Sequence, residues 1–184
     1  MAELDEEQGW IRKSQDGDHE AFEALVTRHQ RVIHSVAYRM TGSLADAEDL
    51  AQQTFIQAFR QLGAYRAEAK FSSWLYRIVF NLALNWKKHQ DSQQRLISDW
   101  GREQMMAASD PGFKRSQQVQ EALLKLNPKQ RAAIILTVYD GLNHAEAALV
   151  LGCSETTVSW RIFTARAKLK KLLSNPQAED VSHD

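Results

Sequence analysis

Basic, hydroxyl and aromatic side chains are concentrated between residues 156 and 173, and this mixture is suited to contact nucleic acid. The segment holds five basic residues and no acidic one. Lysine and arginine can neutralise phosphates, whereas hydroxyl groups and apolar edges can contact base edges in a groove. The side chains predicted to point outward are Thr156, Trp160, Phe163, Thr164, Lys170 and Lys171, and those predicted to lie on the flanks are Ser159, Arg161, Arg166 and Lys168. The alternative is an ordinary helical hairpin whose Trp160 and Phe163 pack on another part of the chain.

Two helices joined by a tight turn are predicted to position these side chains. Asn143 can cap a short helix over 144–151, Gly152 suits the left-handed residue that ends it, and Ser154 can cap a longer helix. The apolar residues of that longer helix recur at spacings of four and three, which predicts a single buried stripe: Val158, Ile162, Ala165, Leu169 and Leu172. The pattern predicts a helix-turn-helix unit that binds DNA.

The net charge argues against a simple DNA-binding domain. Lys+Arg and Asp+Glu both total 23, whereas independent nucleic-acid-binding domains are usually basic. The charges are segregated, because residues 1–23 hold eight acids and two bases, and residues 60–88 hold six bases and one acid. High affinity for DNA by the chain alone is therefore not expected, and a protein partner is predicted to supply the rest.

A second group of basic and aromatic residues lies in a loop predicted over 64–73. Its members are Tyr65, Arg66, Lys70 and Phe71. Aromatic and basic side chains interleaved in a loop suit unstacked bases better than a duplex. The alternative is that Tyr65, Phe71 and nearby Trp74 are core aromatics.

Glycine and proline residues divide the chain into two helical regions. The first is predicted to hold helices over 5–14, 19–40, 44–62 and 73–89. Residues 91–114 are polar and glutamine-rich, which predicts a flexible interdomain linker. The prediction is an all-α fold with two small helical domains, and its segments are an N-terminal domain over 1–90, the linker over 91–114, a helix-turn-helix domain over 115–173 and an acidic tail over 174–184.

The predicted helix over 44–62 has an apolar side and a polar side. Its core side would carry Phe55, Ala58, Phe59 and Leu62, and its outer side Asp46, Asp49, Gln53, Ile56 and Arg60. The outer side is either a solvated face or a protein-binding surface.

Several classes of function are disfavoured. The single cysteine, Cys153, excludes an internal disulfide and fits a reducing cytoplasm. The six histidines are scattered and no catalytic motif is present, so no enzyme, metal site or cofactor is predicted. No apolar run is long enough for a membrane span, so a cytoplasmic protein without membrane insertion is predicted.

Three motifs, in this order, resemble those of bacterial RNA polymerase sigma factors of the extracytoplasmic-function (ECF) group. They are DAEDLAQQTFIQAF at 46–59, FSSWLYRIVFNLALN at 71–85, and LNPKQRAAIILTVYDGLNHAEAALVLGCSETTVSWRIFTARAKL at 126–169. The resemblance implies an alternative sigma factor that binds core RNA polymerase, recognises promoter DNA and promotes its opening. It also implies an anti-sigma factor as a partner.

The resemblance implies a role for individual residues on three surfaces. Core polymerase would be bound by Asp49, Gln52, Gln53 and Ile56. The minus-ten element, with a base flipped out near 65–72, would be bound by Tyr65, Arg66, Lys70, Phe71, Ser72, Trp74, Arg77, Asn81, Lys87 and Lys88. The minus-35 element would be read by Thr156, Thr157, Ser159, Trp160, Arg161, Phe163, Thr164, Arg166 and Lys168. Ser159 and Thr164 occupy positions that are often basic in this family, so promoter preference is not transferred.

Two other functions compete with this interpretation. A stand-alone helix-turn-helix regulator with a helical sensor or dimerisation domain would bind specific DNA without polymerase. A protein-interaction adaptor would show no salt-sensitive DNA binding in any context.

Overall fold

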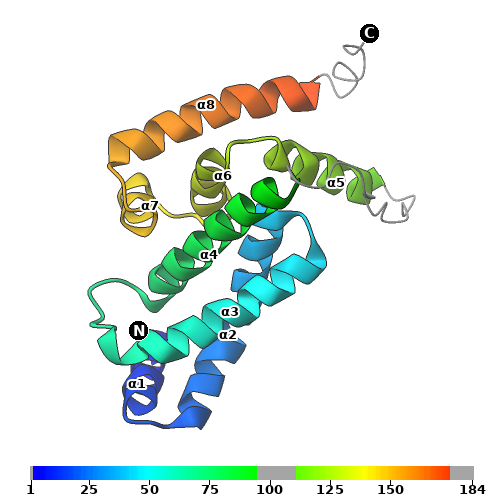
Figure 1. The fold of residues 1–184 in the computed structure, drawn as a ribbon. Coiled ribbons are helices and arrows are strands. Elements are labelled where there is room, and N and C mark those ends of the chain that lie inside the picture. Colours follow the sequence, from blue (N-terminus) through cyan, green and yellow to red (C-terminus); the bar gives the residue numbers. More distant parts are fainter. Residues whose placement is uncertain (1, 95–110, 175–184) are drawn as a thin grey trace. The chain divides into compact units, whose positions relative to one another are not determined.

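All regular elements in the described part of the chain are helical, which confirms the predicted all-α fold (Figure 1). The computed structural model describes residues 2–94 and 111–174, and side chains within 6–87 and 115–174. The elements are α1 (Ala2–Gln15), α2 (His19–Thr41), α3 (Leu44–Gln61), the 3₁₀ turn η1 (Leu62–Ala64), α4 (Phe71–Gln94), α5 (Pro111–Leu124), α6 (Pro128–Ile134), the π turn η2 (Ile135–Tyr139), α7 (His144–Leu151) and α8 (Glu155–Ser174).

The chain divides into two compact units, residues 1–83 and 84–184. Most of the predicted linker, and the predicted acidic tail beyond residue 174, lie outside the described residues. The predicted domain boundaries at 90 and 115 therefore stay predictions.

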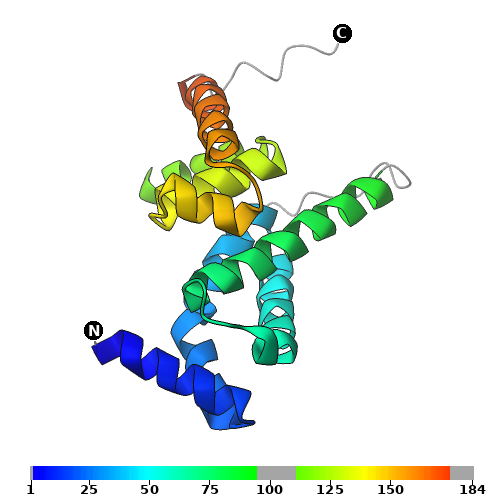
Figure 2. The ribbon, with the colours of Figure 1, turned by 90° about the vertical axis from the view of Figure 1, so that its left-hand side faces the viewer.

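Local sequence explains where the helices of the first unit begin and end. The side chain of Asp18 accepts a hydrogen bond from the Ala21 amide at the start of α2. Gly42 ends α2 with a φ of 77°, a left-handed conformation that glycine adopts without steric cost. Ser43 then caps α3 by accepting from the Asp46 amide. These caps fix the short connection that lets α3 pack back along α2 (Figure 2).

One residue of α3 differs from the predicted core. Phe59 is exposed, although the edge of its ring meets Phe22 with the ring centroids 4.9 Å apart. Thr54, which is not among the predicted core residues, is fully buried. Its hydroxyl donates to the Leu50 carbonyl at 2.7 Å. A hydroxyl bonded back to its own helix is satisfied, so a polar residue can face the core.

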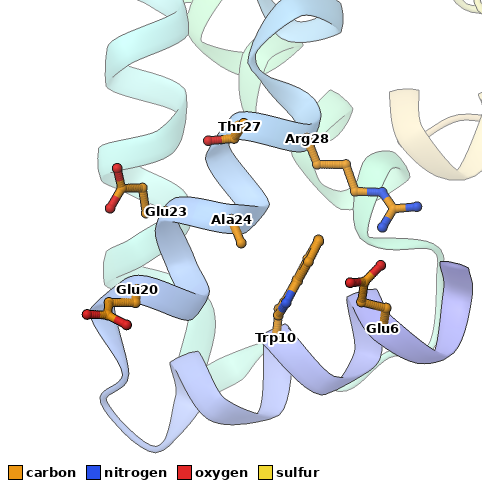
Figure 3. A pocket seen from close by; sticks show the side chains of 7 residues that line it. All are labelled: Glu6, Trp10, Glu20, Glu23, Ala24, Thr27 and Arg28. Carbon is orange, nitrogen blue, oxygen red and sulfur yellow. The ribbon is translucent and has the colours of Figure 1, made fainter.

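Helix α1 packs against α2 and begins earlier than predicted, at Ala2. Trp10 projects from α1 toward α2, where the Arg28 guanidinium lies 5.6 Å from its ring centroid (Figure 3). Around this pair lies an open pocket between the two helices, lined by Glu6, Trp10, Glu20, Glu23, Ala24, Thr27 and Arg28. The acidic charge of the N-terminus is thus placed partly along the α1–α2 groove.

Capping residues also determine where helix α7 of the second unit begins and ends. Asn143 and Glu146 form a reciprocal capping box at the start of α7, and Gly152 ends this helix with a φ of 59°. The α8 stripe is buried at Val158, Ile162 and Ala165, as predicted. The predicted helix-turn-helix geometry is therefore present, with α7 and α8 joined by a short turn (Figure 1).

Candidate nucleic-acid and polymerase interfaces

The side of α8 opposite its buried stripe presents aromatic and basic side chains to solvent. Trp160 is 63% exposed and Phe163 is 74% exposed. Neither ring packs into the core, so the hairpin alternative loses its main support. The other exposed members of the predicted contact set are Thr156, Ser159, Arg166 and Lys168.

Three residues of the predicted contact set are instead half-buried and bonded within the unit. Thr157 belongs to the helix start, where its amide donates to the Ser154 hydroxyl. Arg161 reaches back over the turn, and its Nη1 lies 3.4 Å from the Cys153 Sγ. Thr164 faces α6, where its hydroxyl accepts from the Gln130 side chain. These side chains are less free to reach DNA than the sequence suggested.

Two hydroxyl groups of α8 contact neighbouring helices. The Ser159 Oγ lies 2.9 Å from the Nδ1 of His144, the first residue of α7, and 3.0 Å from the Glu155 carbonyl oxygen. The Thr164 hydroxyl accepts from the Gln130 amide of α6 at 2.9 Å and donates to the Trp160 carbonyl at 2.9 Å. Ser159 is exposed and Thr164 is half-buried, so only the first group lies on the outer face.

Tyr65 of the loop before α4 forms a packed cluster with two aromatic residues in the first turn of α4, Phe71 and Trp74. Tyr65 is 8% exposed and Phe71 is 1% exposed. Ring centroids lie 5.5 Å apart for Tyr65 and Phe71, and 5.1 Å apart for Tyr65 and Trp74. The Tyr65 hydroxyl donates to the Ala69 carbonyl at 2.7 Å, and burial, followed by the nearby Glu7 carboxylate, raises the pKa of Tyr65. Tyr65 and Phe71 therefore have no open ring face for a base, because they hold the loop from within.

Helix α1 also holds this loop, through Gln15. Its Nε2 donates to the Leu62 carbonyl at 3.0 Å and to the Tyr65 carbonyl at 2.9 Å. At the tip of the loop Ala67 has a φ of 55°, which is uncommon for a residue with a side chain. Sequence reasoning missed Gln15, since hydrogen bonds to main-chain carbonyls far along the chain leave no pattern in the sequence.

The loop and the start of α4 nevertheless present exposed polar groups. Arg66 and Lys70 are exposed in the loop, and Arg77 and Asn81 are exposed on α4, whereas Ser72 and Lys87 are half-buried. The side chain of Lys88 lies outside the described residues. The basic part of the predicted minus-ten set is thus largely on the surface, and its aromatic part is largely inside.

The outer face of α3 carries the predicted polymerase contacts. Asp49, Gln52 and Gln53 are exposed, and Ile56 is 51% exposed beside them. A branched apolar side chain among amides and a carboxylate is suited to a protein interface with a small dry centre.

Two other kinds of site receive no support from the described residues. No group of three or more His, Cys, Asp and Glu side chains in that part of the chain could hold a metal ion. Nor does any described helix combine the length and apolar character needed to cross a membrane.

Comparison with known families matches both helical regions. Sigma-70 region 2 matches residues 25–93, and Sigma-70, region 4 matches residues 116–169. The RNA polymerase sigma factor NccH of Alcaligenes xylosoxydans xylosoxydans is 31% identical over 96% of this chain and 100% of its own length. The ECF RNA polymerase sigma factor SigM of Mycobacterium tuberculosis is 34% identical over 85% of this chain and 79% of its own.

Solved structures agree with the sequence relatives. CnrH in complex with the cytosolic domain of CnrY has a TM-score of 0.71 at 28% identity, covering 92% of this chain and 97% of that one. RpoE in complex with the anti-sigma factor NepR from Bartonella quintana has a TM-score of 0.68 at 23% identity, covering 83% of this chain and 96% of that one, and supports the fold. Because the similarity runs along nearly the whole chain, the protein belongs to the extracytoplasmic-function family of RNA polymerase sigma factors.

Proposed function

We propose that this chain acts in the cytoplasm as a non-catalytic initiation factor, which binds core RNA polymerase and directs it to promoters with two separate elements. The observation that carries the proposal is the outer face of α8, where Trp160, Phe163 and Lys168 are exposed on the second helix of a helix-turn-helix unit. Such a helix can enter a major groove while its cations contact the flanking phosphates.

The α3 face is proposed to dock on the polymerase. Asp49 and Gln53 supply polar contacts, and Ile56 supplies apolar area that a partner would cover. Shared binding of DNA by polymerase explains how a chain with 23 acids and 23 bases can act at promoters.

The loop before α4 is proposed to take the minus-ten element through its exposed Arg66 and Lys70, together with Arg77 and Asn81 on α4. Tyr65 and Phe71 have a different role in this proposal from the one that the family resemblance implied. Their buried rings shape the loop from within instead of stacking on a base.

An anti-sigma factor is proposed as the regulatory partner. Both CnrH and RpoE, which resemble this chain along most of its length, were solved as complexes, the first with the cytosolic domain of CnrY and the second with the anti-sigma factor NepR. The surfaces that such a partner would cover on this chain are the α3 face and the outer face of α8.

Run-off transcription tests the proposal. The purified chain is added to sigma-free core polymerase on fragmented genomic DNA of its host, and transcript starts are mapped. Discrete starts that share two upstream elements are the expected result. No starts, together with a footprint by the chain alone, would favour a stand-alone helix-turn-helix regulator, and silence in both assays would favour an interaction adaptor.

A further inference from the structure

His144 and Ser159 form a contact between the two helices of the helix-turn-helix unit. His144 is the first residue of α7 and Ser159 lies on the outer face of α8; both are exposed. The His144 Nδ1 is 2.9 Å from the Ser159 Oγ, which in turn is 3.0 Å from the Glu155 carbonyl oxygen. The contact therefore lies at the surface that a DNA groove would meet.

A serine hydroxyl has one proton to donate and two lone pairs that can accept. If the Nδ1 of His144 carries a proton, the ring donates to Ser159, and Ser159 donates to the Glu155 carbonyl. If that nitrogen carries no proton, Ser159 donates to the ring instead. In both arrangements the hydroxyl proton is used inside the protein, and a lone pair of Ser159 is left for an outside donor.

This asymmetry limits which base edges Ser159 can recognise. In the major groove adenine and cytosine present an amino group, whereas guanine and thymine present keto oxygens. Each base pair contains one base of each kind, so the choice is between the two orientations of the pair. We infer that Ser159, held in place by His144, is a specificity-determining residue that selects an amino base on one strand at one position of the upstream promoter element. The inference rests on the proposed function, because it concerns the element that α8 would read.

Thr164 offers a matched comparison within the same helix. Its hydroxyl also accepts from a side chain and donates to a main-chain carbonyl, but its partner Gln130 lies on α6 and the group is half-buried. Removing Gln130 therefore perturbs a similar bond on the inner side of α8 without touching Ser159. A general loosening of α8 and a specific loss of base selection can be separated in this way.

Selection from a DNA library tests the inference. Holoenzyme, assembled from core polymerase and the full chain, is mixed with duplex DNA carrying a randomised upstream element, and the bound fraction is sequenced. Wild type is expected to enrich adenine or cytosine over guanine or thymine at one position by about three- to tenfold, the range of one neutral hydrogen bond. Ser159→Ala abolishes that preference, His144→Ala reduces it, and Gln130→Ala retains it.

Three results would overturn the inference. The first is an enriched element that Ser159→Ala leaves unchanged at every position. The second is a preference at the position that depends on Ser159 but separates A·T from G·C pairs, or purines from pyrimidines, because a hydroxyl that only accepts predicts adenine and cytosine together on one strand. The third is an equal loss of preference in Gln130→Ala, which would reveal general loosening of α8. Enrichment of no upstream element by wild-type holoenzyme would instead contradict the proposed function itself.

Discussion

Arg131 of α6 has a buried guanidinium that bonds to the end of α5 and so links these two helices of the second unit. Its Nε donates to the Leu123 carbonyl at 2.8 Å, and its Nη2 donates to the carbonyls of Leu124 at 2.5 Å and Leu126 at 3.2 Å. The Leu123 and Leu124 carbonyls lie in the last turn of α5, where a helix lacks its regular amide donors, and the Leu123 carbonyl also accepts from the Leu126 amide at 3.1 Å. Burial lowers the pKa of Arg131 to about 10, so the side chain still carries its charge at neutral pH.

Replacing Arg131 by methionine is therefore expected to cost far more than replacing an exposed cation. Arg131→Met removes the guanidinium donor from three carbonyls at a largely buried site and should lower the free energy of unfolding by about 2–4 kcal/mol. Urea unfolding of the full chain, followed by circular dichroism, measures the change. The exposed neighbour Lys129 supplies the control, and equal stabilities of Arg131→Met and Lys129→Met would show that the guanidinium bonds add nothing.

Tyr65 gives the first unit a specific sensitivity to alkaline pH. Its pKa is raised in the folded state, so above the ordinary value of 10.0 the unfolded chain loses this proton more readily than the folded one. The contribution to stability is complete below about pH 10 and is lost as the pH rises toward the folded pKa. In denaturant titrations, the stability advantage of wild type over Tyr65→Phe should thus be constant up to about pH 9 and shrink as the pH rises above about 10. An advantage that also stays constant above about pH 10 would contradict the burial argument.

At the scale of the element, α1 acts as a brace for the loop before α4. Gln15 is the last residue of α1, and its side chain donates to the carbonyls of Leu62, the first residue of η1, and Tyr65, the residue that follows η1. Earlier in the same helix, the Glu7 carboxylate lies 2.5 Å from the Nε2 of His29 on α2, and this contact keeps α1 aligned with α2. The N-terminal helix thus supports the conformation of a proposed DNA-binding loop.

Gln15→Ala should loosen this loop while leaving α1 helical, because alanine is the best helix former. The loss of two neutral hydrogen bonds is expected to destabilise the loop by about 1–2 kcal/mol and to speed amide exchange at Tyr65. Hydrogen exchange with site resolution measures this effect. Lys13→Ala, a substitution at an exposed position of the same helix, is the control. Unchanged amide exchange in Gln15→Ala would show that the Gln15 hydrogen bonds do not stabilise the loop.

The α3 face makes a separate prediction about polymerase. Asp49→Ala combined with Gln53→Ala is expected to weaken docking on core enzyme by about tenfold or more, since truncation of central interface contacts commonly costs over 1 kcal/mol. Affinity for labelled core polymerase and circular dichroism are measured together. The matched control is Glu23→Ala combined with Thr27→Ala on the exposed side of α2, and equal docking by the two double variants would exclude the α3 face.

Sequence patterns predicted where the helices lie better than they predicted which side chains are in contact, and the reason is physical. Capping residues such as Asn143 and Gly152 act within a few residues, so the helix-turn-helix unit could be placed from the sequence. Burial of Tyr65 and inward rotation of Arg161 depend on neighbours from other elements, which periodicity does not register. The alternative in which Tyr65, Phe71 and Trp74 are core aromatics holds for Tyr65 and Phe71, which are buried, whereas Trp74 is half-buried. The sequence alone could not separate the three, because their burial depends on how α1 and α4 pack.

At the scale of the whole molecule, acidic and basic charges cancel, so affinity for DNA depends on the few cations that are clustered on the proposed DNA-binding surfaces. Acids equal bases over the whole chain, and the segment 156–173 has five bases and no acid. Every phosphate contact in this segment should therefore be visible in the salt dependence of promoter binding.

Lys168→Ala is expected to reduce the slope of log affinity against log salt by about 0.9 for the holoenzyme, without changing base preference. Arg161→Ala should change the slope less, because Arg161 is half-buried and directed at Cys153. Filter binding over a series of salt concentrations measures both variants. Equal changes in slope would show that Arg161 leaves the turn when DNA is bound.

The brace on the loop also bears on how the protein is handled at the bench. The match to Sigma-70 region 2 starts at residue 25, inside α2, so a clone trimmed to that match would omit α1 with Gln15 and also the Asp18 cap and the start of α2. Such a shortened protein would still carry the α3 face and the helix-turn-helix unit. We expect the loss of the bonds that hold the loop to impair DNA melting, a defect that a polymerase pull-down alone would not detect. Affinity tags and truncations are accordingly safer kept away from the first fifteen residues.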